Sequence, residues 1–79
     1  MIIEICGAGC PKCQATEKNV VQALKELGEE AQVIAIKDVK EISARGVILT
    51  PAVVIDGIKA FEGRIPEVRE IKKWIEERK

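Results

Sequence analysis

The residues that could do chemistry in this 79-residue chain lie mostly in one stretch, CGAGCPKC, which spans residues 6–13 and holds all three cysteines. Three thiols that close together suit a metal site, a structural disulfide or a thiol–disulfide exchange reaction. Cys10 and Cys13 form a C-x-x-C motif, a spacing found both in zinc sites and in redox-active proteins. The remainder of the sequence has to distinguish these chemistries.

The ligand count is poor for a zinc site. A structural zinc ion takes four Cys or His ligands, whereas this chain has three cysteines and no histidine. A mononuclear site would therefore need a carboxylate or a second chain. The odd number of cysteines also argues against a purely structural set of disulfides. A soft-metal or metalloid site built from Cys6, Cys10 and Cys13 stays open as the alternative to exchange chemistry.

The residues around the cysteines predict a strand followed by a helix. Residues 2–6 form a short apolar run rich in β-branched side chains, and the Gly-Ala-Gly after it permits a sharp change of direction. Pro11 suits the first turn of a helix, which should continue to about Leu27 and stop at Gly28. Cys10 then stands at the helix entrance and Cys13 lies within the first turn.

A helical projection separates the two thiols of the motif. At 100° per residue, Cys13 points in the same direction as Val20, Leu24 and Leu27, to within about 40°. Its sulfur should therefore be partly buried, while Cys10, outside the regular spiral, faces solvent. This asymmetry suits a dithiol exchanger, in which an accessible thiolate attacks a disulfide and a sheltered thiol resolves the mixed disulfide.

The helix entrance should also make Cys10 the more acidic thiol. Unpaired N–H groups and the helix dipole stabilise a thiolate there, and Lys12 adds a nearby cation. Cysteines in such motifs have pKa values that fall from about 8.5 to about 7 or lower.

The rest of the chain predicts one further strand–helix unit, a hairpin and a last helix. Asp38 with Glu41 forms an acidic capping box before the short second helix, and Asp56-Gly57 is a two-residue hairpin signal. The predicted elements are strands at 32–37, 51–55 and 58–62, a helix from 38 to about 45 and a helix from 66 onward. The order β-α-β-α-β-β-α predicts a single α/β domain over residues 1–79, with a four-stranded mixed sheet and helices on both faces.

The charge balance and the hydropathy of the chain indicate which binding partners and which cellular compartment to expect. Thirteen basic residues balance thirteen acidic ones, and no basic block suggests nucleic acid as a partner. No apolar run is long enough to predict membrane insertion, and the N-terminus does not read as a signal peptide. A cytoplasmic location follows as the expectation, and disulfides in that compartment are usually transient and catalytic. Lys59, Arg64 and Arg69 are expected to be solvated surface charges.

These features together resemble the small thioredoxin/glutaredoxin-like redox-active disulfide proteins of the thioredoxin-like superfamily. The resemblance extends over essentially the whole chain and rests on five segments: residues 6–13, 15–19, 50–52, 56–57 and 63–64. It implies a protein disulfide oxidoreductase active in electron transport, with Cys10 as the nucleophile and Cys13 as the resolving cysteine. The redox group would be the Cys10–Cys13 disulfide itself, with no organic cofactor and no metal.

The resemblance also implies a surface for the substrate. Pro51 would be a cis proline that lies across from the cysteine pair and keeps metal away from it. The backbone of Thr50 would pair with an extended substrate, and Pro11 and Gly63 would border the same surface. The implied partners are protein disulfides and a dithiol reductase that donates electrons.

Two further residues of the first predicted strand, Glu4 and Cys6, carry groups that could do chemistry. Cys6 is expected to be a buried apolar residue that ends the strand, as is common for free cysteine. Thioredoxin has a buried acidic residue that assists its resolving cysteine, and this chain has no clear counterpart. Glu4 is the acidic residue on the first strand.

Overall fold

The computed structural model describes residues 1–7, 9 and 11–78, and its elements follow the predicted order. The four strands form one sheet in the order β2-β1-β3-β4. The elements are β1 (Ile2–Cys6), α1 (Pro11–Leu27), β2 (Gln32–Ile36), α2 (Val39–Ala44), β3 (Ala52–Ile55), β4 (Ile58–Glu62) and α3 (Val68–Glu76). The predicted α/β fold with a four-stranded mixed sheet and three helices is confirmed.

Element boundaries differ from the predicted ones by one or two residues. β3 begins at Ala52 rather than Pro51, because a proline has no N–H for the strand ladder. α3 begins at Val68, since Glu67 is its N-cap and Pro66 precedes the helix. α2 is capped as predicted, and the Asp38 carboxylate accepts a hydrogen bond of 2.8 Å from the Lys40 N–H.

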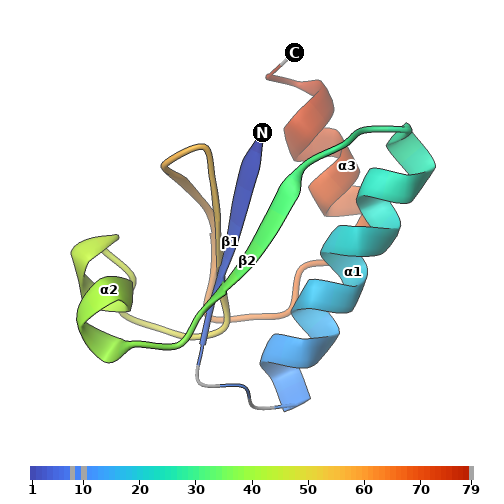
Figure 1. Ribbon diagram of the computed structural model, residues 1–79. Coiled ribbons are helices and arrows are strands. Elements are labelled where there is room, and N and C mark those ends of the chain that lie inside the picture. The colour runs from blue at the N-terminus through green and yellow to red at the C-terminus, as the bar shows by residue number, and fades with distance from the viewer. Residues whose placement is uncertain (8, 10, 79) are drawn as a thin grey trace.

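Strand register brings the end of β1 beside the start of β3. β1 runs parallel to β2 and antiparallel to β3, and Cys6 pairs with Ile36 on one side and Ala52 on the other. The β3–β4 hairpin turns at Asp56 and Gly57, whose φ angles of 49° and 83° suit a two-residue turn. The β1–α1 connection and the residues before β3 therefore meet at one edge of the sheet, opposite the chain termini (Figure 1).

Two apolar clusters cover the two faces of the sheet. α1 and α3 pack on one face and α2 lies on the other (Figure 1). Side chains of β1 alternate, so that Ile3 and Ile5 face α1 and α3 while Cys6 faces α2. The larger cluster contains Ile3, Ile5, Val20, Ala23, Leu24, Val53, Ile55, Ile71 and Ile75; the smaller one contains Cys6, Ile36, Ile42, Val47, Ala52 and Val54. All four residues of β3 are buried, as expected for a strand covered on both sides.

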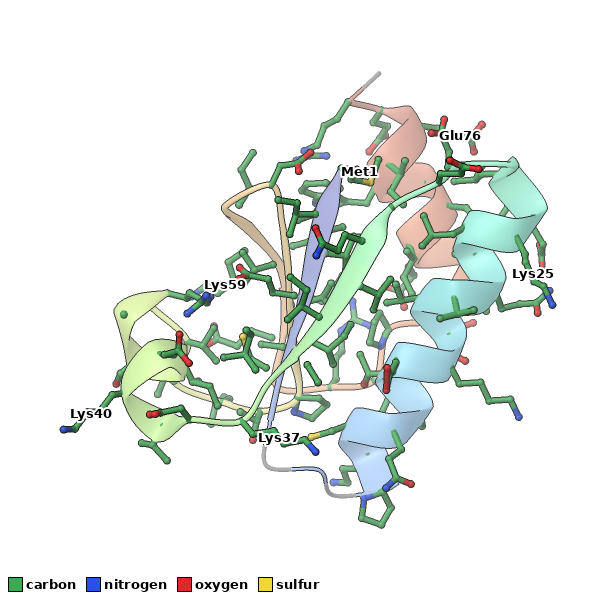
Figure 2. All side chains as sticks on the ribbon, in the orientation of Figure 1. Met1, Lys25, Lys37, Lys40, Lys59 and Glu76 are labelled. Carbon is green, nitrogen blue, oxygen red and sulfur yellow. The ribbon has the colours of Figure 1, made fainter. Side chains whose placement is uncertain are left out.

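Charged side chains surround these clusters. Figure 2 shows Lys25 of α1 and Lys40 of α2 directed away from the sheet, and both residues are exposed. None of the described helices is both long and apolar enough to cross a membrane.

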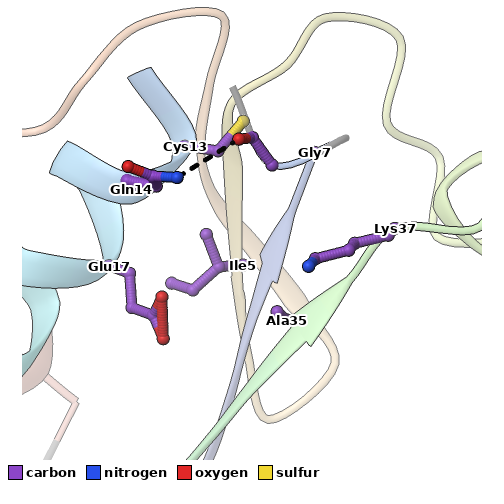
Figure 3. Close-up of a pocket in the computed structure, with 8 residues that line it drawn as sticks. Ile5, Gly7, Cys13, Gln14, Glu17, Ala35 and Lys37 are labelled. Carbon is purple, nitrogen blue, oxygen red and sulfur yellow. Dashed lines mark hydrogen bonds between the residues drawn. The ribbon is translucent and has the colours of Figure 1, made fainter. Parts of the chain in front are cut away.

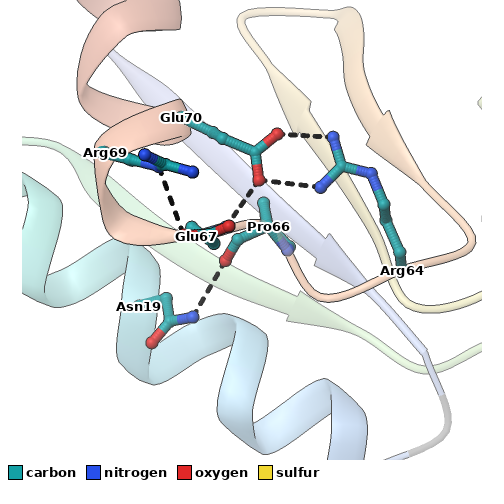
Figure 4. A network of polar contacts seen from close by, with 6 residues as sticks. All are labelled: Asn19, Arg64, Pro66, Glu67, Arg69 and Glu70. Carbon is teal, nitrogen blue, oxygen red and sulfur yellow. Dashed lines mark hydrogen bonds and ion pairs between the residues drawn. The ribbon is translucent and has the colours of Figure 1, made fainter.

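A polar network ties the start of α3 to the rest of the molecule (Figure 4). The Arg64 guanidinium donates to both oxygens of Glu70, over 2.8 and 2.6 Å. Glu70 also accepts a bond of 3.0 Å from the Glu67 N–H, and the Asn19 amide on α1 donates to the Pro66 carbonyl over 2.8 Å. The hydrogen bonds from Arg64, followed by that from the Glu67 backbone, lower the pKa of Glu70 to about 2.

This network should make the protein sensitive to acid. A carboxyl whose pKa falls on folding contributes stability above its unfolded pKa and loses that contribution as the pH drops through its folded pKa. For Glu70 the free energy of unfolding should therefore fall between about pH 4.5 and about pH 2. Glu70→Gln should lower the free energy of unfolding at neutral pH. It should also make that free energy depend less on pH between about 4.5 and about 2, as measured by urea titrations at several pH values. Glu76→Gln, at an exposed position on the same helix, is the matched control and should leave the pH dependence of the free energy of unfolding unchanged.

Candidate active site

Three segments converge where β1 ends. Gly7 extends β1 by donating its N–H to the Ile36 carbonyl over 2.9 Å, and it is buried. A β-carbon built on Gly7 would overlap the Cys13 sulfur and would lie 3.8 Å from the Thr50 β-carbon. Glycine is therefore required here by close approach, because any side chain would displace the first turn of α1. The β1–α1 junction, Cys13 and the segment before β3 form one site.

Cys13 lies on the apolar face of α1. Its exposed fraction is 6%, so the burial predicted from the helical projection is confirmed. Val20 and Leu24 are buried with it, while Leu27 is only half-buried. Thr16 also lies on this face, fully buried, and its hydroxyl donates to the Lys12 carbonyl over 2.8 Å. Thr16 was not predicted to be buried, although its spacing of three residues from Cys13 and four from Val20 places it on the same face of the helix.

Two other residues of the motif, Pro11 and Lys12, precede Cys13 on α1. Cys10, the predicted nucleophile, lies outside the described residues, and its role stays a prediction. Pro11 opens α1 as expected, and both Pro11 and Lys12 are exposed on the first turn. One turn later the Gln14 amide donates to the Gly9 carbonyl over 3.4 Å, which bridges α1 and the preceding loop.

The Thr50–Pro51 peptide bond is cis, in agreement with the prediction. Thr50 is exposed while Pro51 is buried. The buried proline ring holds the segment against the protein, and the preceding Thr50 stays accessible to solvent. The Gly63 N–H donates to the Pro51 carbonyl over 2.9 Å, and Gly63 has a φ of 80°, a conformation that favours glycine. The structure thus brings Thr50, Pro51 and Gly63 together, as predicted from the resemblance.

A pocket of about 200 Å³ lies beside Cys13, between the ends of β1 and β2 and the first turns of α1 (Figure 3). It is lined by Ile5, Gly7, Gly9, Cys13, Gln14, Glu17, Ala35 and Lys37. Lys37 and Glu17 extend into it from opposite sides, above an apolar floor of Ile5 and Ala35 (Figure 3). Neither charged residue was predicted to line a pocket: the sequence placed Lys37 at the end of a strand and Glu17 within the first helix.

Cys6 is separate from this site. It is fully buried among Ile36, Ile42 and Ala52 on the α2 face, and this burial raises the pKa of its thiol. The expectation of a buried apolar residue that ends β1 is confirmed. α1, which holds Cys13, covers the opposite face. Within residues 1–7, 9 and 11–78, the structure has no group of three Cys, His, Asp or Glu side chains placed to hold a metal ion.

Glu4 is likewise turned away from α1. Its carboxylate pairs with the Arg45 guanidinium at the end of α2, over 3.0 Å to one oxygen and 2.7 Å to the other. The hydrogen bonds from Arg45 lower the pKa of Glu4 against the opposing effect of burial. Glu4 therefore links β1 to α2 and lies on the face of the sheet opposite Cys13.

Comparison with known proteins agrees with this architecture. The family model described as a thioredoxin domain matches residues 1–76. The chain belongs to the thioredoxin family. A thioredoxin of Methanocaldococcus jannaschii is 48% identical over 73 residues, which cover 92% of this chain and 84% of the relative. A thioredoxin of Methanothermobacter thermautotrophicus is 41% identical over 73 residues, with 92% and 95% covered. Membership of the thioredoxin family identifies the chain, in general terms, as a thiol–disulfide oxidoreductase.

The close approach of Gly7 and Cys13 can be tested by a double-mutant cycle. Gly7→Ala should lower the free energy of unfolding of the reduced protein by about 1–3 kcal/mol, because the new methyl group overlaps the Cys13 sulfur. In a Cys13→Ala background the same change should cost clearly less, because the overlapping atom is gone. Equal costs in the two backgrounds, measured by urea titration, would contradict the packing described here.

Proposed function

We propose that the protein is a dithiol oxidoreductase that exchanges disulfides in partner proteins through Cys10 and Cys13. The observation that supports this best is the position of Cys13. It is sheltered in the first turn of α1 against Gly7, a position that also approaches Thr50 of the cis Thr50–Pro51 bond, in a chain of the thioredoxin family. A sheltered thiol three residues after a thiol at a helix entrance is the arrangement that two-step exchange requires.

In the proposed reaction the Cys10 thiolate attacks one sulfur of a protein disulfide. The substrate S–S bond breaks, a mixed disulfide forms, and the released substrate sulfur takes up a proton. Cys13 then loses its proton and attacks the Cys10 sulfur, which forms the Cys10–Cys13 disulfide and releases the second substrate thiol. The substrate gains two electrons and two protons in total, and the protein disulfide awaits reduction.

The residues near Cys13 support this sequence of steps. Burial of the Cys13 sulfur limits its reaction with other thiols, so that it attacks chiefly the mixed disulfide held beside it. The start of α1 stabilises a thiolate at its entrance, and the exposed Lys12 adds positive charge to the same turn. The redox group is the cysteine pair, and the reaction as written uses no organic cofactor.

An extended segment of the substrate would lie along the residues before β3. Thr50 is exposed immediately before the buried Pro51, so its main chain is open to pairing with a partner. Gly63 lies beside Pro51 and Pro11 opens α1, and neither places a large side chain at this edge. We infer a cytoplasmic location, where a dithiol reductase would return the two electrons after each turnover.

Cysteine variants test the proposal directly. Cys10→Ser should lower the rate of insulin disulfide reduction by at least about 100-fold, because the attacking thiolate is gone. Cys13→Ser should form a mixed disulfide with the substrate that persists and is visible by mass spectrometry. Cys6→Ala is the matched control and should keep most of the activity, since Cys6 is sealed on the α2 face. Activity that survives Cys10→Ser would refute the assignment of the nucleophile.

The same preparations distinguish exchange from metal binding. Native mass spectrometry should show a reversible mass loss of two protons on oxidation of the wild-type protein, and Cys13→Ser should abolish it. A stoichiometric metal ion that depends on Cys6, Cys10 and Cys13 together would contradict the proposal and favour the metal-binding alternative.

A further inference from the structure

The segment before the cis proline, residues 47–50, is held by a side chain from the far strand of the hairpin. Glu62 is the last residue of β4, and one of its carboxylate oxygens accepts hydrogen bonds from two successive backbone N–H groups. These come from Ile48, over 2.6 Å, and from Leu49, over 3.1 Å. We call residues 47–50 the pre-proline loop. A single carboxylate thus satisfies two donors of a segment that has no strand partner.

Lys59 braces this contact. Its ammonium lies 3.0 Å from the other oxygen of Glu62, which is three residues further along β4, and it donates to the Gly46 carbonyl over 3.0 Å. Figure 2 shows Lys59 reaching toward the C-terminal end of α2. Lys59 is exposed, as predicted for a surface charge, and in addition it forms these two polar contacts. With Glu62 it joins β4 to the middle of the pre-proline loop and to Gly46, the residue before it.

Burial of its own side chains cannot hold the pre-proline loop in place. Ile48 is 87% exposed and Leu49 is 61% exposed, and only Val47 at the start of the loop is buried in the α2 cluster. The loop depends instead on polar contacts to β4 and on the packing of Leu49 beside Gly63. A β-carbon on Gly63 would lie 3.2 Å from the end of the Leu49 side chain, which shows how closely the two segments meet.

The contact persists at all ordinary pH values. The hydrogen bond from the Ile48 backbone, then those from Lys59 and the Leu49 backbone, lower the pKa of Glu62 to about 2. An ionised carboxylate accepts stronger hydrogen bonds from backbone N–H groups than a neutral oxygen does. The electrostatics therefore agree with the geometry of the contact.

We infer that Glu62 is a positioning residue for disulfide exchange with proteins. Its carboxylate fixes the pre-proline loop so that the main chain of Thr50 is presented to an extended segment of the partner. This inference rests on the proposed function, in which Thr50 pairs with the substrate. Within the described part of the chain, the polar contacts of Glu62 are with Ile48, Leu49 and Lys59, so it acts through the loop.

A selective effect on substrates follows. A protein disulfide lies within a peptide chain that can pair with Thr50, whereas a small aromatic disulfide such as DTNB has no peptide backbone. Loosening the pre-proline loop should slow the reduction of protein disulfides and leave the reduction of DTNB nearly unchanged. A general loss of structure around Cys13 would instead slow both reactions.

Three variants of the full chain separate these possibilities. Glu62→Ala removes the acceptor, and kcat/KM for insulin reduction should fall by about tenfold, mainly through a higher KM, while the DTNB rate stays within about twofold of wild type. Glu62→Gln keeps an amide oxygen that can accept both N–H groups, so it should restore most of the insulin activity. Glu26→Ala is the matched control, because it removes an ion-paired carboxylate on α1, 2.9 Å from Lys72. It should leave both rates unchanged.

Amide hydrogen exchange measures the loop directly and does not depend on activity. Faster exchange at Ile48 and Leu49 in Glu62→Ala, with α1 still protected, is expected. Equal losses of insulin and DTNB activity, no loss of either, or no rescue by Glu62→Gln would overturn the role assigned to Glu62. If the wild-type protein reduces neither substrate, the proposed function fails instead, which is a different result from a wild-type enzyme that is indifferent to Glu62.

Discussion

The contact between the Gly7 backbone and the Cys13 sulfur determines how the first helix sits on the sheet. α1 can bring its first turn this close to the end of β1 only because residue 7 has no β-carbon. The same contact buries Cys13 on the α1 side of the sheet. The burial of Cys13 therefore depends on how closely the helix packs against the backbone of β1.

Strand order then brings a second segment to the same place. Because β1 lies between β2 and β3, and Cys6 pairs with Ala52, the residues that precede β3 reach the edge where β1 ends. Thr50 comes within contact distance of the Gly7 position for this reason. At the end of β4, Glu62 accepts hydrogen bonds from backbone N–H groups of the pre-proline loop, and the following Gly63 donates to the Pro51 carbonyl. Elements from both halves of the chain thus build the edge proposed for substrate binding.

Local patterns in the sequence predicted the features that depend on neighbouring residues. Helical spacing predicted that Cys13 is buried, and the Asp56-Gly57 pair predicted the hairpin turn. The contacts of Glu62 and Lys59 could not be predicted, because they join residues more than ten positions apart and depend on the conformation of a loop. The pocket between Glu17 and Lys37 was not predicted for a similar reason: it forms only where α1 packs beside the ends of β1 and β2, which are distant in sequence.

The separation of the chain ends from this edge has a practical consequence. Both termini emerge at the side of the sheet away from Gly7 and the pre-proline loop (Figure 1). A peptide tag, a fluorophore or a solid support attached to either end would extend away from the edge of the sheet where β1 ends. The protein could then be immobilised through its ends on a solid support, with the edge where β1 ends still facing the bulk solution.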